Sequence, residues 1–226
     1  MANEIIVLEN VQKEFHLGGN IIRALIDIDV SINVGEFVMI MGSTGCGKTT
    51  LLNAMSGLEI TDQGKIFLDG DYIDRASEGK LATIRRHKIG FVFQEFNLVE
   101  NLTAIENVEA VLWPIGLGSK NIEDRAIQAL RRVDLLERKD HFPNELSGGE
   151  KQRVAIARAI VNQPRIIFAD EPTGNLDEES AHLIMRLLTE LNKDLETTLV
   201  MVTHDSGLKK YASRMIKMEA GRIVNK

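Results

Sequence analysis

A glycine-rich octapeptide at residues 42–49, G-S-T-G-C-G-K-T, restricts the fold of this chain more than any other feature. It matches the pattern G-x-x-x-x-G-K-[ST], in which the backbone N–H groups of a loop surround phosphate oxygens. The apolar run 36–41 before it predicts a strand, and residues 48–57 after it predict a helix. This order of strand, loop and helix predicts a phosphate-binding loop within an α/β fold.

The loop supplies a chemically distinct set of candidate phosphate ligands. Its glycines allow close approach of the backbone, Lys48 supplies a mobile cation for the β- and γ-phosphates, and the Thr49 hydroxyl is a candidate Mg²⁺ ligand. The helix that follows adds free N–H donors and a favourable dipole. The candidate nucleotide-binding residues of this segment are Gly42, Ser43, Thr44, Gly45, Cys46, Gly47, Lys48, Thr49 and Thr50.

A second apolar run, I-I-F-A-D-E at residues 166–171, ends in two carboxylates. Ligands bind at the carboxyl ends of strands in open α/β sheets, so both acids are candidates for the same site. Successive strand residues point to opposite faces, which predicts different tasks for them. We expect Asp170 to hold hydrated Mg²⁺ and Glu171 to orient or deprotonate a water molecule.

The rest of the chain alternates between strand and helix patterns, which predicts an α/β core with a parallel sheet. Residues 95–145 hold only helical patterns, so we expect a helical subdomain there and a core formed by residues 1–94 and 146–226, all within one domain. Further strands are expected at 4–11, 24–32, 64–68, 89–93, 166–170 and 198–203, a hairpin at 215–224, and helices at 78–87, 104–112, 123–134, near 143, 151–160 and 178–195.

Charge and composition exclude several classes of protein. A net charge of −6 disfavours a nucleic-acid partner, because proteins that grip phosphate backbones carry basic surfaces. A single cysteine excludes an intramolecular disulfide. No apolar run approaches the roughly 18 residues of a membrane span, and Glu4 and Glu9 make the start unlike a signal peptide. We therefore expect a soluble chain that is not exported.

Three more segments carry candidate site residues. L-S-G-G-E at residues 146–150 opens a predicted helix, with Ser147 as its N-cap and two glycines that expose backbone N–H donors. Gln94 directly follows the strand at 89–93, and His204 directly follows the strand at 198–203. Both positions lie at the edge of the sheet where the phosphate loop is expected.

Together these segments resemble the nucleotide-binding subunit of an ATP-binding cassette (ABC) transporter along essentially the whole chain. The resemblance rests on L-S-G-G-E-K-Q-R-V-A-I-A-R-A, about 100 residues after the phosphate loop, and on A-D-E-P-T-G-N-L-D after it. It implies a P-loop NTPase (RecA-like) core with an antiparallel β subdomain and an inserted α-helical subdomain. It also implies a homodimer with two ATP molecules sandwiched between phosphate loops and opposing L-S-G-G-E segments.

The resemblance assigns expected roles to single residues. Glu171 would be the catalytic base, His204 would sense the γ-phosphate and position Glu171, and Gln94 would contact the metal or the attacking water. Phe15 would stack on adenine, and Asp177 would couple the two sites across the dimer. The segment that meets the partner's γ-phosphate would comprise Ser147, Gly148, Gly149 and Glu150.

Three segments resemble the lipoprotein-release and macrolide-export branch of this family, which includes cell-division ATPase subunits. Their sequences are R-R-H-K-I-G-F-V-F-Q-E-F-N-L-V, L-T-A-I-E-N-V and A-D-E-P-T-G-N-L-D. This branch implies a separate permease with few membrane helices, and a cytoplasmic position on the inner face of the cell membrane. The alternatives are a regulatory ABC ATPase without cargo, a soluble ABC ATPase acting on nucleic acid or ribosomes, and a GTPase. The guanine-reading motif of a GTPase is absent.

Two further features allow alternative interpretations. The basic run Arg85-Arg86-His87-Lys88 is a solvated helix end or a contact for acidic lipid headgroups or the permease. Cys46 stands where the family often has Ser, close to a helix N-terminus that favours thiolate. We expect reagents that modify its thiol to inactivate the protein, and ATP to protect it.

Overall fold

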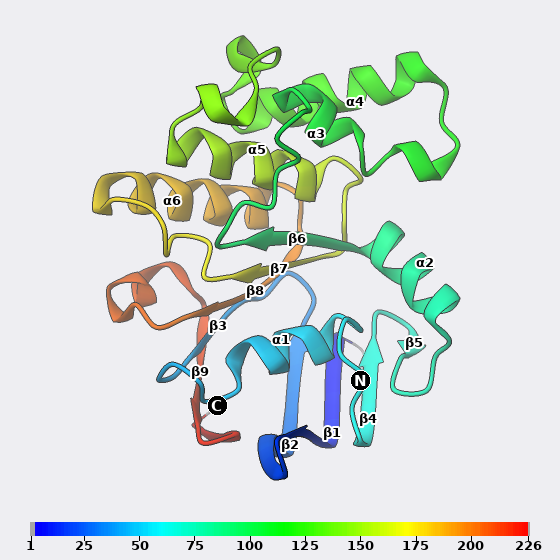
Figure 1. The fold of residues 1–226 in the computed structure, drawn as a ribbon, viewed down its shortest axis with the longest axis vertical. Helices are drawn as coiled ribbons and strands as arrows, with labels where there is room; N and C mark the ends of the chain where they lie inside the picture. Colours follow the sequence, from blue (N-terminus) through cyan, green and yellow to red (C-terminus); the bar gives the residue numbers. More distant parts are fainter. Residues whose placement is uncertain (1–2, 226) are drawn as a thin grey trace.

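A six-stranded sheet with strand order β10-β9-β3-β8-β7-β6 forms the centre of the computed structural model, which describes residues 3–225 (Figure 1). Its inner strands run parallel, and β10 pairs antiparallel with β9 at one edge. The strands are β3 (Phe37–Met41), β6 (Ile89–Phe93), β7 (Ile166–Asp170), β8 (Thr198–Thr203), β9 (Arg214–Glu219) and β10 (Arg222–Asn225).

A second, antiparallel sheet has the strand order β2-β1-β4-β5. Its strands are β1 (Glu4–Leu17), β2 (Asn20–Asn33), β4 (Gln63–Leu68) and β5 (Asp71–Tyr72). Helix α1 (Lys48–Met55) lies between this sheet and the six-stranded sheet, whose opposite face is covered by α5 (Gly148–Ile160) and α6 (Glu178–Asp194) (Figure 1). Helices α3 (Ala104–Glu109) and α4 (Ser119–Arg132) pack on α5, while α2 (Glu78–Lys88) leads into β6.

The parallel strands are apolar throughout because both of their faces are covered. In β7, Phe168 belongs to the core between the two sheets, whereas Ile167 and Ala169 belong to the core under α3–α6. Strand β8 alternates in the same way, with Val200 facing one core and Met201 the other. Two cores therefore hold the central sheet, and the strand ends are placed by packing on both sides.

The predicted elements are mostly confirmed, and the α/β class is correct. Strands β6, β7 and β8 match the expected ranges, whereas β1 and β2 extend beyond theirs into a long hairpin. The expected helix at 104–112 ends earlier, and a 3₁₀ turn at Trp113–Ile115 follows. Near residue 143 the structure has only the 3₁₀ turn Pro143–Glu145. Pro143 has no backbone N–H, so it can begin this turn but cannot donate a hydrogen bond that would continue a helix from the residues before it. The two-residue strand β5 was not expected.

The elements between β6 and α5 are helices and 3₁₀ turns, and the subdomain limits at residues 95 and 145 stay a prediction. None of the helices formed by residues 3–225 has the length and apolar character needed to cross a membrane.

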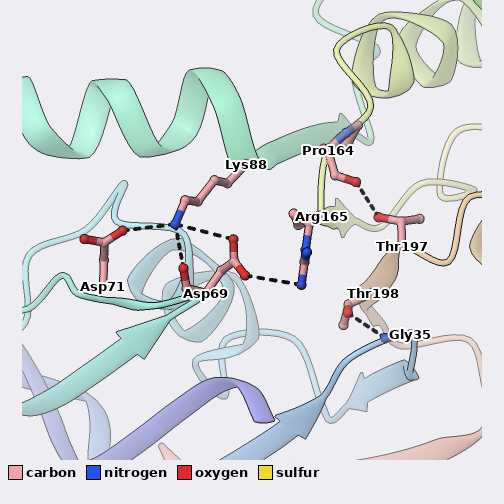
Figure 2. A network of polar contacts seen from close by, with 8 residues as sticks. All are labelled: Gly35, Asp69, Asp71, Lys88, Pro164, Arg165, Thr197 and Thr198. Atoms are coloured by element: carbon pink, nitrogen blue, oxygen red, sulfur yellow. Dashed lines mark hydrogen bonds and ion pairs between the residues drawn. The ribbon is translucent and has the colours of Figure 1, made fainter. Parts of the chain in front are cut away.

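Ion pairs join the antiparallel sheet to the amino-terminal edge of the central sheet (Figure 2). The Lys88 ammonium at the end of α2 donates to Asp69 O at 2.5 Å and to Asp71 Oδ2 at 3.0 Å. Arg165, just before β7, lies 3.5 Å from Asp69 Oδ1. In the same region, Thr197 Oγ1 donates to the carbonyl of Pro164, and the Gly35 amide donates to Thr198 Oγ1.

The basic run 85–88 is therefore only partly available to a partner. Lys88 pairs with the two aspartates, and Arg85 donates to the Gly57 carbonyl and pairs with Glu78. Lys80 also hydrogen-bonds Asp71, and this bond, together with the bond from Lys88, lowers the pKa of the Asp71 carboxyl. The charges at this helix end mainly serve the connection between the two sheets.

We predict that Gly90→Ala destabilises the protein because β6 packs tightly on α5. A Cβ at Gly90 would lie 2.3 Å from the Ala159 carbonyl oxygen, so backbone must move. We expect a loss of about 1–3 kcal/mol in the free energy of unfolding, measured by urea denaturation. Gly79→Ala is the matched control, because nothing lies within 4 Å of its Cβ in the first turn of α2. That variant should gain roughly 0.5–1 kcal/mol. Equal unfolding of the two variants would contradict this packing argument.

Candidate active site

A cavity of about 590 Å³ opens at the carboxyl-terminal edge of the central sheet. Each of four strands of this sheet is followed directly by a candidate residue: β3 by Gly42, β6 by Gln94, β7 by Glu171 and β8 by His204. The predicted site residues that line the cavity are Phe15, Thr44, Gly45, Gly47, Lys48, Thr49, Thr50, Gln94, Asp170, Glu171 and His204.

The phosphate loop is held tightly against strand β2. Gly47, the N-cap of α1, adopts a left-handed conformation with φ 103°, which side chains other than glycine disfavour. A Cβ at this position would lie 2.3 Å from the Ala24 carbonyl oxygen. The loop can therefore reverse direction and start α1 at Lys48 only with glycine here. The N-terminal N–H groups of α1 consequently face the cavity.

Lys48 is 7% exposed, and its ammonium donates to the carbonyls of Gly42 at 2.9 Å and Ser43 at 3.0 Å. These two bonds satisfy only part of the three-donor ammonium group. A cation held at the wall of a cavity in this way is suited to bind an anionic ligand. The loop thus combines one fixed positive charge with backbone donors.

Thr49 and Asp170 meet at the floor of the cavity, where Thr49 Oγ1 donates to Asp170 Oδ1 at 3.2 Å. Burial raises the pKa of the Asp170 carboxyl, and the nearby Glu171 charge adds to this effect. A hydroxyl and a half-buried carboxylate are the hard oxygen ligands that Mg²⁺ prefers. A divalent cation beside them would also favour the ionised carboxylate. These two residues therefore fit a magnesium site.

Glu171 follows β7 in a strained left-handed conformation with φ 46°. Its amide donates to Val202 O at 3.0 Å, and its Oε1 lies 2.9 Å from His204 Nδ1. Asp170 instead contacts Thr49, so the two neighbouring acids have different partners, as the strand alternation predicted. The arrangement presents an oriented carboxylate backed by an imidazole.

Gln94 is locked to the loop that follows Glu171. Its Nε2 donates to Asn175 Oδ1 at 3.1 Å, and Asn175 Nδ2 donates back to Gln94 O at the same distance. Gly174 leaves room for this pair, since a Cβ there would lie 2.8 Å from Gln94 Nε2. Sequence reasoning did not identify Asn175, because only the fold brings residues 94 and 175 together.

Phe15 lines the outer part of the cavity on β1, opposite Ile22 of β2. The Lys13 ammonium lies 5.1 Å from the centroid of its ring. Sequence analysis also missed Ile22 and Arg23 as lining residues. The pairing of Phe15 with Ile22 across the hairpin is the signal that could have identified them.

Some of the predicted site residues do not line the cavity. Cys46 is 5% exposed and packs in the core between the sheets, which works against the expected reactivity of its thiol. Asp177 is the N-cap of α6 and accepts from Ser180 N at 2.9 Å, a bond that lowers the pKa of its carboxyl. The others outside the cavity lining are Gly42, Ser43, Ser147, Gly148, Gly149 and Glu150.

The L-S-G-G-E segment forms the start of α5 with a capping box. Ser147 Oγ accepts from Glu150 N at 3.3 Å, and Ser147 N donates to Glu150 Oε2 at 2.9 Å. The bond from Ser147 N lowers the pKa of the Glu150 carboxyl. Within residues 3–225 the amides of Gly148 and Gly149 have no acceptor, so two N–H donors point out of this helix end.

Comparison with known proteins gives consistent results. Residues 25–174 match the family model described as "ABC transporter". The chain is 43% identical to the lipoprotein-releasing system ATP-binding protein of Bacteroides thetaiotaomicron, over 97% of this chain and 99% of the relative. It is similar to a dimeric structure of an ATP-binding cassette of Methanocaldococcus jannaschii bound to ADP and Pi, with a TM-score of 0.89, 41% identity and 97% coverage of both chains.

Other relatives are much longer than this chain. It is 45% identical to ABC transporter H family member 2 of Dictyostelium discoideum over 98% of its own length, but spans only 44% of that protein. It is 43% identical to the macrolide export ATP-binding/permease protein of Chlorobaculum tepidum, again over 98% of its length, and spans 34% of it. The P-loop NTPase fold is thus confirmed, and the chain belongs to the ABC transporter family, in the branch with lipoprotein-release and macrolide-export ATP-binding proteins.

Proposed function

We propose that this chain is a Mg²⁺-dependent ATPase subunit, which pairs with a second copy around two ATP molecules and drives a separate membrane permease. The single observation that carries this proposal is the separation of two sets of phosphate-binding donors. The phosphate loop, Asp170 and Glu171 line the cavity, whereas the unpartnered amides of Gly148 and Gly149 lie outside it. A second copy can supply the missing donors to each cavity.

The cavity residues divide into binding and reacting groups. Lys48 and the loop amides bind phosphate oxygens, and Phe15 stacks on the adenine ring. Thr49, Asp170 and Gln94 would hold Mg²⁺, directly or through water, and the bound ion would supply positive charge beside the phosphate oxygens. Glu171 accepts a proton from the attacking water, and His204 holds its carboxylate in position. Asp177 and Gln94 connect this cavity with the partner copy and the permease.

Both copies carry a net charge of −6, so their mutual repulsion opposes association without a ligand. The γ-phosphate bridges the phosphate loop of one copy and the α5 N-terminus of the other, and so supplies the attraction. Hydrolysis removes this bridge and lets the pair reopen. Closing and opening of the pair is the movement that we propose to act on the permease.

A membrane permease as the partner is supported by the names of the relatives. The Chlorobaculum relative is named as an ATP-binding/permease protein, and the chain matches only 34% of it. The Bacteroides relative, named as an ATP-binding protein of a lipoprotein-releasing system, is matched over 99% of its length. We therefore propose that this chain acts on the cytoplasmic face of the cell membrane, bound to a permease of the lipoprotein-release or macrolide-export type.

The proposal predicts that ATP hydrolysis by the isolated protein depends on its concentration. Because one copy cannot complete a site, activity per chain should rise in proportion to concentration until the pair saturates. Steady-state phosphate release measured over a hundredfold range of protein concentration checks this. Activity per chain that stays constant down to the lowest concentration would contradict the shared site.

We predict that Glu171→Gln keeps ATP binding but lowers kcat by about 10²- to 10⁴-fold, since the amide cannot accept the proton. The variant should accumulate as an ATP-bound dimer, detectable by size-exclusion chromatography. Glu190→Gln, at an exposed position on α6, is the control and should turn over normally and remain monomeric. If Glu171→Gln hydrolyses ATP at the normal rate, another group is the base.

We predict that Ser147→Arg reduces turnover by roughly 100-fold while ATP affinity stays nearly unchanged, because α5 serves the partner's nucleotide. Loss of the cap also lowers stability by about 1 kcal/mol. Ser77→Arg is the matched control, since Ser77 caps α2 in the same way at 3.4 Å from Lys80 N. Nucleotide titration and phosphate release separate the two effects. A parallel loss of affinity in Ser147→Arg argues against a site shared between copies.

A further inference from the structure

Helix α5 is connected by Gln152 to the backbone beside two of the cavity residues. Gln152 is 0% exposed, and its Nε2 donates to Pro172 O at 2.6 Å and to Phe93 O at 3.3 Å. Pro172 directly follows Glu171, and Phe93 directly precedes Gln94. One side-chain amide thus holds the peptide groups next to both residues that face the reacting phosphate in the proposed function.

The carbonyl oxygen of the Gln152 side chain, in contrast, is destabilising to bury. Gln152 Oε1 has no hydrogen-bond partner among residues 3–225. A buried polar atom without a partner destabilises a protein by about 1–3 kcal/mol, whereas an apolar side chain of similar shape would pack there without this penalty. Packing alone therefore does not account for glutamine at this position. The two donated bonds are what the side chain contributes.

Arg158, six residues further along α5, makes an equivalent connection. Its guanidinium donates to Phe96 O at 2.7 Å and to Asn97 O at 2.5 Å. Phe96 and Asn97 have φ values of 60° and 50°, a conformation that non-glycine residues adopt only when their surroundings hold them there. Burial lowers the pKa of this guanidinium, and its two hydrogen bonds both go to backbone carbonyls. Its bonding is directed to the loop after Gln94.

Gln94 is therefore held on both sides by side chains of one helix. Gln152 binds the residue before it, and Arg158 binds the second and third residues after it. Gln152 lies about 6 Å along the axis from the first residue of α5, at 1.5 Å per residue. Because a helix of this length moves as a rigid body, a displacement of its N-terminus carries these four carbonyl contacts with it.

We propose that Gln152 and Arg158 are positioning residues, which align Gln94 and Glu171 in one copy's site when the start of the same copy's α5 engages the partner's nucleotide. This inference rests on the proposed function. It makes each site sensitive to occupancy of the other through one helix. Neither side chain contacts the substrate, so both act on turnover rather than on ATP binding.

Gln152→Met tests the inference, because methionine keeps the length of the side chain and removes both its donor and its orphaned oxygen. We expect kcat to fall about tenfold, with KM for ATP and ATP-dependent dimerisation in the Glu171→Gln background unchanged. Asn192→Leu is the matched control. Asn192 is another buried amide, donating to Gly35 O at 3.1 Å and Thr197 O at 2.6 Å at the opposite edge of the sheet. The Asn192→Leu variant should lose thermal stability but keep the kcat of the parent protein.

A second pair of variants, at Arg158 and Arg153, tests the inference if Gln152→Met folds poorly. Arg158→Met should lower kcat in the same way, whereas Arg153→Met should not, because Arg153 donates to Val133 O in the helical region at 2.9 Å. The inference is overturned if kcat stays within twofold of the parent, falls equally in the control variants, or falls together with ATP affinity. Failure of the proposed function is distinct, since the parent protein itself would then show no concentration-dependent hydrolysis.

Discussion

The parallel arrangement of β3, β8, β7 and β6 is the constraint on which the site depends. Parallel strands in register end at a common edge, and pairing of Met41 with Thr203 and of Phe93 with Asp170 brings their ends level. The residues that follow β6, β7 and β8 then line the same cavity, and the loop that follows β3 brings Lys48 and Thr49 to it. Groups as distant in the chain as Phe15 and His204 therefore line one cavity. Covering both faces of the sheet keeps that edge in place.

This constraint also explains how much the sequence could predict. The strands at 89–93, 166–170 and 198–203 are short, apolar and bounded by polar residues, so their ends, and with them Gln94, Glu171 and His204, were readable. The phosphate loop carried its own signature. Asn175, Ile22 and Arg23 were missed because their place in the site depends on pairing between distant segments. Gln152 was missed because nothing in the sequence distinguishes it from other polar residues of a helix. Only the packing of α5 shows that its side chain reaches backbone carbonyls.

In the proposed function, the groups that surround the nucleotide are divided between the two copies. Lys48 is the buried cation at the loop, while Asp170 and Glu171 stand opposite with a raised pKa on Asp170. The free amides of Gly148 and Gly149 are neutral donors strengthened by the dipole of α5. Such donors attract an anion without adding net charge to the −6 of each copy. A nucleotide and its metal therefore complement the surface better than a protein partner alone could.

The same helix that offers these amides also holds the loops of its own copy. Gln152 and Arg158 tie α5 to residues on either side of Gln94, and Gln94 is in turn bonded to Asn175 in the segment after Glu171. A ligand at the start of α5 can change the other site only if it binds one arrangement of these loops better than another. The φ values at Phe96, Asn97 and Glu171 lie in the left-handed region, so these residues are strained and the hydrogen bonds around them favour the observed arrangement. Coupling between the two sites then needs no movement of the central sheet, and the cores on both of its faces remain intact while the loops change.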